Sequence, residues 1–282
     1  MTTSRQACAA NAAAADAAAA ASALAHRRLE GGRRVLRATT RPAPALTIVT
    51  VAYNGCKHLA DTIDSVLGLD RHDVDYIVVD GGSTDGTVDI LTARRDRLEY
   101  WLSEPDGGIY QAMNKAVGLA APGSYVLFLG VADRILRLPD TTTIAAARAA
   151  GAEVLYGDVL IGDELFRSSF SAKLNYRNTL HHQGLFIRKG CLPEPWFDES
   201  LRVFSDWDMN LDLFTRQVSA QHLGFTVAYA EPEGISAKLH LAEIARMIAK
   251  RRGWMHALVA VGYHGGLHIL RRYASFPSSA RK

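Results

Sequence analysis

The segment Ile77–Val88, which reads IVVDGGSTDGTV, limits the possible folds more than any other part of the chain. Ile77–Val79 is a β-branched run typical of a buried strand, and Asp80–Thr87 is a run of small and acidic residues that predicts a turn. Glycine allows a sharp turn or a close approach of the backbone to a ligand. Aspartate and serine at the end of a strand either accept hydrogen bonds from a ligand or cap the next helix. The segment predicts a strand, a turn and a helix, and it leaves ligand binding open.

Similar strand and helix patterns lie on both sides of this segment. We expect strands at 46–51, 77–79, 98–103 and 124–129, and helices at 59–67, 88–94 and 109–119. This alternation predicts an α/β fold with a mostly parallel sheet sandwiched by helices. Ligands of such sheets bind beyond the carboxyl ends of the strands. Tyr53, Asn54, Asp80 and Asp133 all follow expected strands, so we expect them near a ligand.

The chain lacks the glycine-rich motifs that cradle phosphates. No GxGxxG follows the first strand and no GxxxxGK[ST] is present, so neither a typical dinucleotide-binding fold nor a P-loop is supported. A nucleotide site would therefore use carboxylates and a metal ion. The net charge of +3 is too small to argue for nucleic acid as a partner. The three cysteines form no CxxC pair, which fits a reducing, cytoplasmic compartment.

Composition divides the chain into three parts. Residues 1–45 contain an alanine-rich run and several arginines, and we expect a low-complexity, loosely ordered leader without a membrane span. Residues 46–240 carry the strand and helix patterns and form the expected folded domain. Residues 241–282 form a basic, amphipathic helical tail.

Four segments in order carry a family resemblance. They are TVAYNG (50–55), VDGGSTDGT (79–87), a segment beginning at Ser103, and YVLFLGVAD (125–133). This series resembles the family 2 inverting glycosyltransferases of the GT-A fold, and most of all the bacterial enzymes that build surface polysaccharides or glycolipids. Further matches are LYGD (155–158), HHQ (181–183), SDWD (205–208) and GIS (234–236). The resemblance covers about residues 46–236.

The resemblance implies a set of residues that bind a nucleotide-sugar donor. Asp80 would accept a hydrogen bond from the base, and Tyr53 and Asn54 would lie near the base and the ribose. The remaining donor-binding candidates are Asp106, Asn114, Lys115 and His182. Each has a plainer alternative, because turns, helix caps, solvated lysines and structural histidines use the same residue types.

The resemblance also implies a divalent cation, Mg²⁺ or Mn²⁺, beside the diphosphate of the donor. Hard cations prefer carboxylate oxygens, and a cation neutralises the charge that develops on the leaving group. Asp133 stands at the family's metal position, but Ala132 occupies the place where many relatives have a second acid. This difference leaves open weaker metal binding or loss of activity. Asp158 is a further candidate oxygen ligand, or a residue of a strand-end turn.

Inversion requires a base that removes the proton of the acceptor hydroxyl. The resemblance assigns this role to Asp206, which precedes Trp207 at an expected helix start. Asp208 is the alternative, as a cap or as a supporting residue. No nucleophile is needed in such a reaction.

The C-terminal tail has a one-sided charge composition. Residues 246–282 contain eight Lys or Arg and no Asp or Glu, and an apolar stretch with Trp254 and Tyr263 lies between the basic clusters. Such a segment is typical of a helix on an anionic membrane surface. Packing against the catalytic domain is the alternative. A lipid-linked acceptor at the inner face of the cell membrane fits the first interpretation.

The leading hypothesis is thus an enzyme that transfers a sugar, with the help of a metal, to a hydroxyl of a glycan or glycolipid acceptor. The alternative is a catalytically impaired module that binds a nucleotide-sugar or a partner protein, because one acid is replaced by Ala132. A nucleotidyltransferase is a weaker option, since residues 46–54 lack the glycine-rich, basic signature of that class.

Overall fold

The computed structural model describes residues 28–36, 43–232 and 240–274. The centre of the described chain is a parallel sheet in the order β4 (Tyr100–Ser103), β3 (Val74–Asp80), β2 (Leu46–Ala52) and β5 (Tyr125–Gly130). These strands are the ones that the sequence predicts. All residues of β2 and β3 are buried, which explains their continuous β-branched and apolar character.

A second, mixed half adds five strands to this sheet, which has ten strands within the described residues when β1 (Leu29–Gly31) at the opposite edge is included. β9 (Leu185–Arg188) lies antiparallel between β5 and β7 (Val154–Ile161), and β7 runs parallel to β10 (Ala220–Ala230). Two short strands complete this half: β6 (Arg134–Ile135) pairs with β10, and β8 (Glu164–Phe166) pairs with β7. The α/β class is confirmed, and the antiparallel pairs of the second half add to what the sequence predicted.

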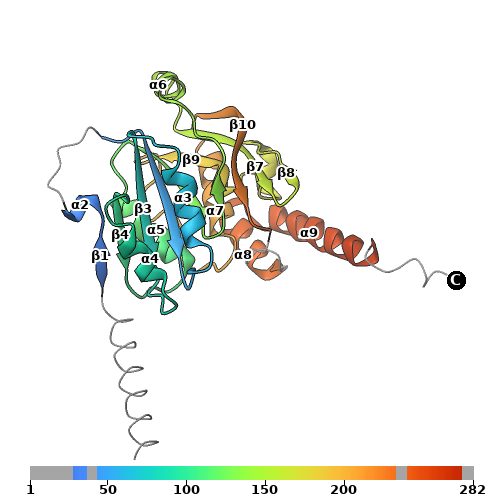
Figure 1. Cartoon of the computed structure of the whole chain (residues 1–282). Helices are drawn as coiled ribbons and strands as arrows, with labels where there is room; N and C mark the ends of the chain where they lie inside the picture. Colours follow the sequence, from blue (N-terminus) through green and yellow to red (C-terminus); the bar gives the residue numbers. More distant parts are fainter. Residues whose placement is uncertain (1–27, 37–42, 233–239, 275–282) are drawn as a thin grey trace, which may run out of the picture.

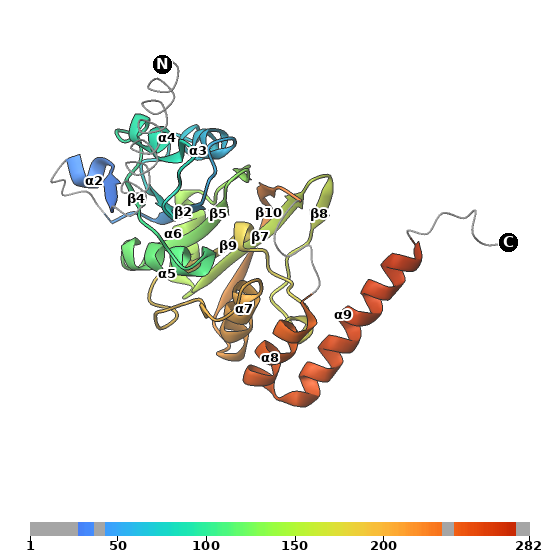
Figure 2. The same cartoon turned by 90° about the horizontal axis from the view of Figure 1, so that it is seen from below.

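Helices cover both faces of the sheet (Figures 1 and 2). One face carries α3 (Leu59–Leu67), α4 (Thr87–Ala93) and α6 (Thr141–Ala149), and the other carries α5 (Ile109–Leu119), α7 (Ser205–Thr215), α8 (Leu241–Arg252) and α9 (Trp254–Ala274). Successive residues of a strand point to opposite faces of the sheet and so belong to two different hydrophobic cores. Val49 and Val51 point to the α5 side, and Leu46 and Ile48 point to the α3 side.

Residues 28–36 belong to the edge of the sheet. β1 (Leu29–Gly31) pairs antiparallel with β4, and the short helix α2 (Arg33–Leu36) follows it. Position 31 favours glycine, because the Cβ of any other residue would lie only 2.6 Å from Nε1 of Trp101. The expectation of a loose leader up to residue 45 is therefore wrong for residues 28–36. The rest of that segment up to residue 42 lies outside the described residues.

The expected C-terminal tail divides into two helices with different surroundings. Ile244, Met247 and Ile248 of α8 are buried in the same core as α5 and α7, so α8 is part of the domain. α9 follows after Gly253 and extends beyond the rest of the described chain in both views (Figures 1 and 2). None of the described helices combines the length and the apolar character that a membrane crossing requires.

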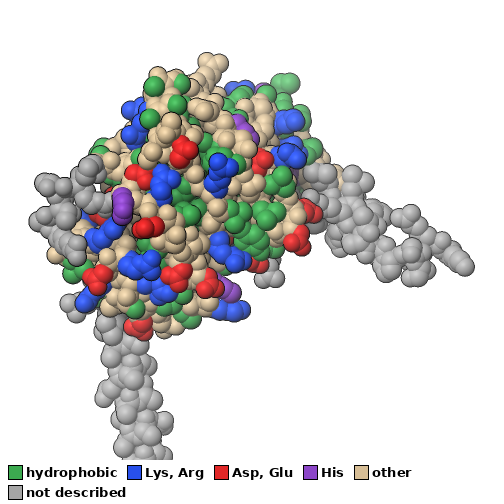
Figure 3. Space-filling model, turned by 45° about the horizontal axis from the view of Figure 1, so that its top comes forward, with side chains coloured by type: hydrophobic (Ala, Val, Ile, Leu, Met, Phe, Trp, Pro, Cys, Tyr) green, Lys and Arg blue, Asp and Glu red, His purple; other side chains and the backbone are tan. Residues whose placement is uncertain are grey.

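The surface carries charges of both signs. On the face drawn in Figure 3, Lys and Arg side chains alternate with Asp and Glu side chains, and no single sign dominates. This distribution agrees with the small net charge of +3.

Candidate active site

A cavity of about 680 Å³ lies at the carboxyl ends of β2, β3 and β4. It is lined by Val51, Ala52, Tyr53, Gly81, Gly82, Thr84, Pro105, Asp106, Gly107, Gly108, Ile109 and Ala112. Its volume is in the range of cavities that hold nucleotide-sized ligands. Tyr53 is 70% exposed, so its side chain is accessible to a ligand in the cavity. Of the predicted donor-binding residues, Tyr53 and Asp106 line the cavity.

Asp80 lies beneath the cavity and is fully buried. Its Oδ2 atom accepts hydrogen bonds from the Ser83 amide at 2.9 Å and from the Ser103 hydroxyl at 2.6 Å, and Oδ1 accepts from the Ser83 hydroxyl. The Gly82 amide also donates to Oδ2, at 3.2 Å. In this structure Asp80 therefore fixes the turn that forms the cavity wall, and its oxygens point to protein donors.

Asn54 connects the turn after β2 to the turn after β3. The backbone amide of Asn54 donates a hydrogen bond to Oγ of Ser83 at 2.7 Å. Its side-chain Oδ1 accepts a hydrogen bond from the backbone amide of Thr84 at 3.0 Å. Asn54 has a positive φ of 48°, a conformation that asparagine tolerates better than most residues. The asparagine is thus explained by loop geometry, beside the ligand contact that the resemblance implies.

Asp106 stands at the opposite wall, close to the β3 turn. A Cβ on Gly81 would lie 2.7 Å from Oδ2 of Asp106, so only glycine fits there without a shift. Burial raises the pKa of Asp106. The hydrogen bond from the Gly108 amide and the charge of Lys115 lower this pKa, and the charges of Asp80 and Glu104 raise it further.

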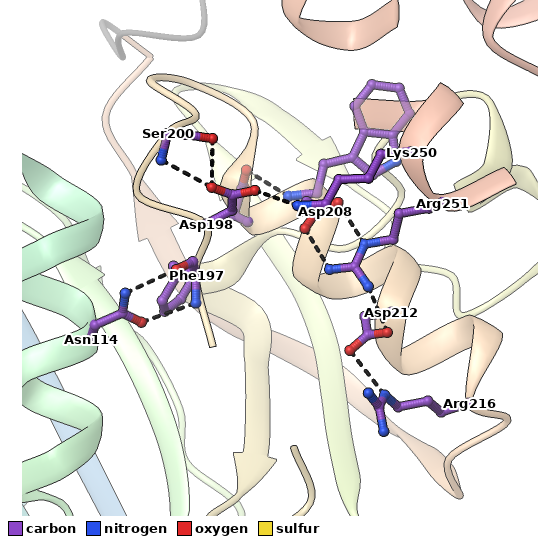
Figure 4. Close-up of polar contacts among 11 residues, drawn as sticks. Asn114, Phe197, Asp198, Ser200, Asp208, Asp212, Arg216, Lys250 and Arg251 are labelled. Carbon is purple, nitrogen blue, oxygen red and sulfur yellow. Dashed lines mark hydrogen bonds and ion pairs between the residues drawn. The ribbon is translucent and has the colours of Figure 1, made fainter. Parts of the chain in front are cut away.

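Asn114 and Lys115 make other contacts. Asn114 bonds reciprocally with the backbone of Phe197, at 2.9 Å and 3.0 Å (Figure 4), and Nζ of Lys115 lies 2.8 Å from Oε1 of Glu104. Neither residue is among those that line the cavity. Asn114 thus joins α5 to the segment before α7, and Lys115 pairs with the loop that follows β4.

Asp133 follows β5 and is 4% exposed. Its Oδ2 accepts from the Gly130 amide at 2.8 Å and from Nε2 of Gln183 at 2.7 Å, and its Oδ1 accepts from the Glu231 amide at 3.0 Å. A carboxylate has about four acceptor positions, so these three bonds leave one for a cation. Among the described residues, no group of three or more His, Cys, Asp or Glu is placed to hold a metal ion. Within the described residues, Asp133 thus offers one carboxylate with a free acceptor position and no neighbouring acid cluster.

Gln183 links Asp133 to the histidine pair. Its Oε1 contacts Nδ1 of His181, and the rings of His181 and His182 stack with centroids 5.2 Å apart. Burial, with the neighbouring charge of His182, lowers the pKa of His181 to about 4. His181 is therefore neutral near pH 7, which is consistent with a hydrogen bond from Nδ1–H to the amide oxygen of Gln183.

Asp206 lies in the first turn of α7, where the helix dipole favours a carboxylate. Its Oδ2 is 3.6 Å from Nδ1 of His182 and 3.3 Å from Nδ2 of Asn178. Asp208 faces elsewhere: it is 2% exposed and forms a bidentate pair with Arg251 of α8, at 2.6 Å and 2.5 Å (Figure 4). Of the two acids that the sequence offered, Asp206 is the one beside His182.

Other predicted residues lie outside this arrangement. Asp158 accepts a hydrogen bond from the Ser168 amide at 2.9 Å and contacts His222. It therefore stabilises the region around β7 and β8. Gly234, Ile235 and Ser236 lie outside the described residues. Gln183 and Ser103 were not among the predicted site residues, although Gln183 stands in the HHQ motif, and Ser83, a candidate helix cap from the sequence, instead bonds to Asp80. Their polar side chains next to buried strands were the available signal.

The model of glycosyl transferase family 2 matches residues 47–131, from β2 to the end of β5. A "PGL/p-HBAD biosynthesis glycosyltransferase" of Mycobacterium bovis is 31% identical over 182 residues, which cover 61% of this chain and 71% of that protein. The chain belongs to glycosyltransferase family 2. It is therefore a transferase, as the ordered motifs predicted.

Other similar proteins agree with this assignment. The "putative teichuronic acid biosynthesis glycosyltransferase TuaG" of Bacillus subtilis is 36% identical over 94 residues, 32% of this chain and 37% of that protein. The solved structure of S. aureus TarS with UDP-GlcNAc has a TM-score of 0.58, 20% identity, and coverage of 83% of this chain and 74% of that one. A Pyrobaculum calidifontis mannosyltransferase with GDP-Man and Mn²⁺ has a TM-score of 0.53 and 15% identity, with coverage of 85% and 78%. These two structures share the fold of this glycosyltransferase.

Proposed function

We propose that this glycosyltransferase moves a sugar, with inversion, from a nucleoside-diphosphate donor to a hydroxyl of a glycan or glycolipid. The observation that carries the proposal is the meeting of three distant segments. Asp133 after β5, the His181–Gln183 segment and Asp206 of α7 form one continuous set of contacts. This set places a carboxylate, a histidine pair and a second carboxylate beyond the strands of one sheet.

We assign the cavity at the ends of β2, β3 and β4 to the nucleotide. Tyr53 contacts the base or the ribose, and Asp80 and Asn54 act by holding the turns of Gly81–Thr84 in place. Asp106 forms the other wall of the cavity. Asn114 and Lys115 support the donor site through Phe197 and Glu104. The occurrence of UDP-GlcNAc and GDP-Man with structures of the same fold supports a nucleotide-sugar as donor.

The proposed reaction uses Asp206 as the base. Its carboxylate takes the proton of the acceptor hydroxyl while that oxygen bonds to the anomeric carbon, and the bond from this carbon to the diphosphate oxygen breaks. Attack from the face opposite the leaving group inverts the anomeric configuration. His182, 3.6 Å from Asp206, orients the carboxylate, and when protonated it offers positive charge near the departing diphosphate.

A divalent cation, Mg²⁺ or Mn²⁺, is part of this proposal. Asp133 would hold it with its remaining acceptor position, together with phosphate oxygens of the donor, a ligand set that Mg²⁺ commonly uses. When bound, the cation neutralises charge on the diphosphate. Because Ala132 supplies no second acid, we expect weak cation binding without nucleotide. Titration of Mn²⁺ with and without UDP, followed by electron paramagnetic resonance, checks this; equal affinity in both would contradict it.

The names of two relatives, which mention PGL/p-HBAD biosynthesis and teichuronic acid biosynthesis, support a proposal for the acceptor class. We therefore propose a hydroxyl on such a glycan or glycolipid as the acceptor. A panel of acceptor glycosides with nucleotide-sugar donors tests this directly.

The decisive variant is Asp206→Asn, with transfer followed as release of nucleoside diphosphate and appearance of product. Loss of a general base lowers the rate by about 10²–10⁴-fold, and we expect donor affinity to stay unchanged. Asp61→Asn, which changes an exposed carboxylate on α3, is the control and should retain activity. Unchanged turnover in Asp206→Asn would remove this residue as the base. Donor binding without turnover in the wild-type protein would favour the binding-module alternative.

A further inference from the structure

Helix α9 has one face that is both exposed and free of charge. Trp254, Met255, Leu258, Val259 and Tyr263 are exposed by 68%, 82%, 70%, 57% and 40%. At 100° per residue, positions 254, 255, 258, 259, 262, 263 and 266 fall within about 180° of the helix circumference. Positions 262 and 266 are glycines. Over residues 254–266, the part of α9 whose side chains the structure describes, a continuous half of the helix therefore presents only uncharged side chains and glycine; we call it the outer face of α9.

The opposite face of α9 is packed against the domain. Ala257 and Ala260 are buried, and the ring of His264 lies 5.5 Å from that of Trp207. Nε2 of His264 lies 3.0 Å from the carbonyl oxygen of Tyr176, and the rings of His256 and Tyr176 stack at 5.8 Å. These contacts fix the rotation of the helix, so its outer face points away from the protein.

Exposed arginines lie beside the outer face and on the neighbouring helix α8. Arg246 and Arg252 of α8 are exposed, and exposed Arg177 lies beside Tyr263, with Nη1 3.5 Å from the hydroxyl. No Asp or Glu occurs between residues 246 and 282, where the sequence has eight Lys or Arg. An exposed apolar helix face with a nearby arginine and a basic neighbouring helix matches a surface that carries both acyl chains and negative headgroups.

We propose that the outer face of α9 binds the surface of an anionic phospholipid membrane. Trp254, Met255, Leu258 and Val259 enter the boundary between headgroups and acyl chains, and the surrounding arginines contact the lipid phosphates. A second copy of the chain is a poorer occupant. Two outer faces packed together would enclose the guanidinium of Arg177 of each copy, which lies beside Tyr263 and forms no ion pair within the described residues.

The position of α9 connects this surface to the proposed reaction. Trp207, which packs on His264, is the residue next to Asp206, and Arg251 of α8 holds α7 through Asp208 and Asp212 (Figure 4). The helix with the proposed base is therefore fixed directly to the membrane-binding pair of helices. This arrangement suits an acceptor anchored in the same membrane, an extension that rests on the proposed function, whereas membrane binding itself does not.

Co-sedimentation of the full chain with vesicles tests the surface. We expect binding to vesicles of phosphatidylcholine with 30% phosphatidylglycerol, and about tenfold weaker binding to phosphatidylcholine alone or in high salt. The double variant Trp254→Ser/Leu258→Ser should lose about tenfold in affinity for the anionic vesicles. Leu136→Ser/Leu165→Ser, which changes two exposed leucines elsewhere, is the control and should bind as the wild type does. Unfolding temperature, measured for each variant, identifies any loss of folding.

Several results would overturn the proposal. Equal binding of the double variant and the wild type would exclude the outer face. Equal binding to neutral and anionic vesicles would exclude the role of charge. A wild-type dimer that the double variant converts to a monomer, with no vesicle binding, would assign the face to a second copy. These outcomes are separate from the proposed function, because the double variant should still transfer sugar to a water-soluble acceptor while losing transfer to a vesicle-embedded one.

Discussion

Ala132 has a backbone conformation that residues with a side chain usually avoid. Its φ is +77°, in the left-handed region, at the position where the resemblance places an acid in many relatives. The amide of Ala132 donates to Oγ1 of Thr62 at 3.0 Å, which holds this turn against α3. A Cβ in this region raises the energy of the folded state, and short polar side chains or glycine tolerate it better.

We expect Ala132→Gly to raise the free energy of unfolding by about 0.5–1 kcal/mol, because the strain outweighs the greater flexibility of the unfolded chain. Urea denaturation measures the change. Ala146→Gly is the control: Ala146 is exposed in the middle of α6, and its replacement should lower stability by about 0.5–1 kcal/mol. A loss of stability in Ala132→Gly similar to that of the control would show that the turn is not strained.

His181 makes stability depend on pH. Burial lowers its pKa to about 4, against about 6.5 for an unperturbed histidine. Below pH 6.5 the unfolded chain takes up a proton that the folded protein does not, so stability falls as the pH falls from 6.5 towards 4. Between pH 7 and pH 4.5 the wild type should lose about 2–2.5 kcal/mol more of its free energy of unfolding than His181→Gln, which cannot titrate at this position. Denaturation curves at both pH values give this difference, and parallel losses would contradict the shift.

The positions of the candidate carboxylates were predictable from the sequence, and their burial was not. The motifs placed Asp80, Asn54, Asp133 and Asp206 correctly at the ends of strands or the start of a helix, because those positions follow from local patterns. Their partners come from distant segments: Asp80 bonds to Ser103, 23 residues away, and Asp133 to Gln183, 50 residues away. A local pattern contains no information on such pairs, so the buried state of both carboxylates was not predictable.

At the scale of elements, α8 supports the approach to α7. Oε1 of Glu243, in α8, accepts hydrogen bonds from the amides of Arg202, Val203 and Phe204 at 3.1, 2.8 and 2.9 Å. Glu243 is 7% exposed, and these amides directly precede the helix that bears Asp206. One carboxylate of the C-terminal region thus fixes the start of the helix with the proposed base.

We expect Glu243→Leu to leave three amides without a partner and to reduce the free energy of unfolding by about 2–4 kcal/mol. Glu243→Gln keeps an acceptor, and its free energy of unfolding should fall by only about 1 kcal/mol. In this variant we expect kcat to fall by a larger factor than any change in KM for the donor. Arg246→Gln, on the exposed side of α8, is the control and should leave both quantities unchanged. Equal stability of Glu243→Leu and the control would show that the contact has no structural role.

The predictable elements are those with a strong local pattern. The strands of the parallel core and helices α3 and α5 agree with the expected ranges to within a few residues, since each carries a continuous apolar run or a helical period. β1 was missed because three residues, Leu29–Gly31, show no period, and their strand exists only through pairing with β4. β9, with four residues, is likewise determined by its neighbours β5 and β7.

At the scale of the whole molecule, the boundary near residue 240 separates sequence compositions, and it does not separate folded units. Ile244, Met247 and Ile248 of α8 are each at most 1% exposed and belong to the core beneath α5 and α7. Full burial of such side chains stabilises a protein by about 1.5–3 kcal/mol each, or about 5–9 kcal/mol together. This sum is comparable to the whole stability of a typical domain, about 5–15 kcal/mol.

We therefore expect a chain that ends at His240 not to form a stable folded domain, whereas a chain that ends at Gly253 keeps α8 and folds with reduced stability. Thermal unfolding followed by circular dichroism compares the two with the full chain. The chain ending at Gly253 should show a cooperative transition at a lower temperature, because Ala257, Ala260 and His264 no longer cover the domain. It should also lose binding to anionic vesicles while retaining affinity for nucleotide, since the cavity at β2, β3 and β4 contains no residue of α9. A chain ending at His240 that unfolds at the same temperature as the full chain would show that the catalytic domain is complete without α8.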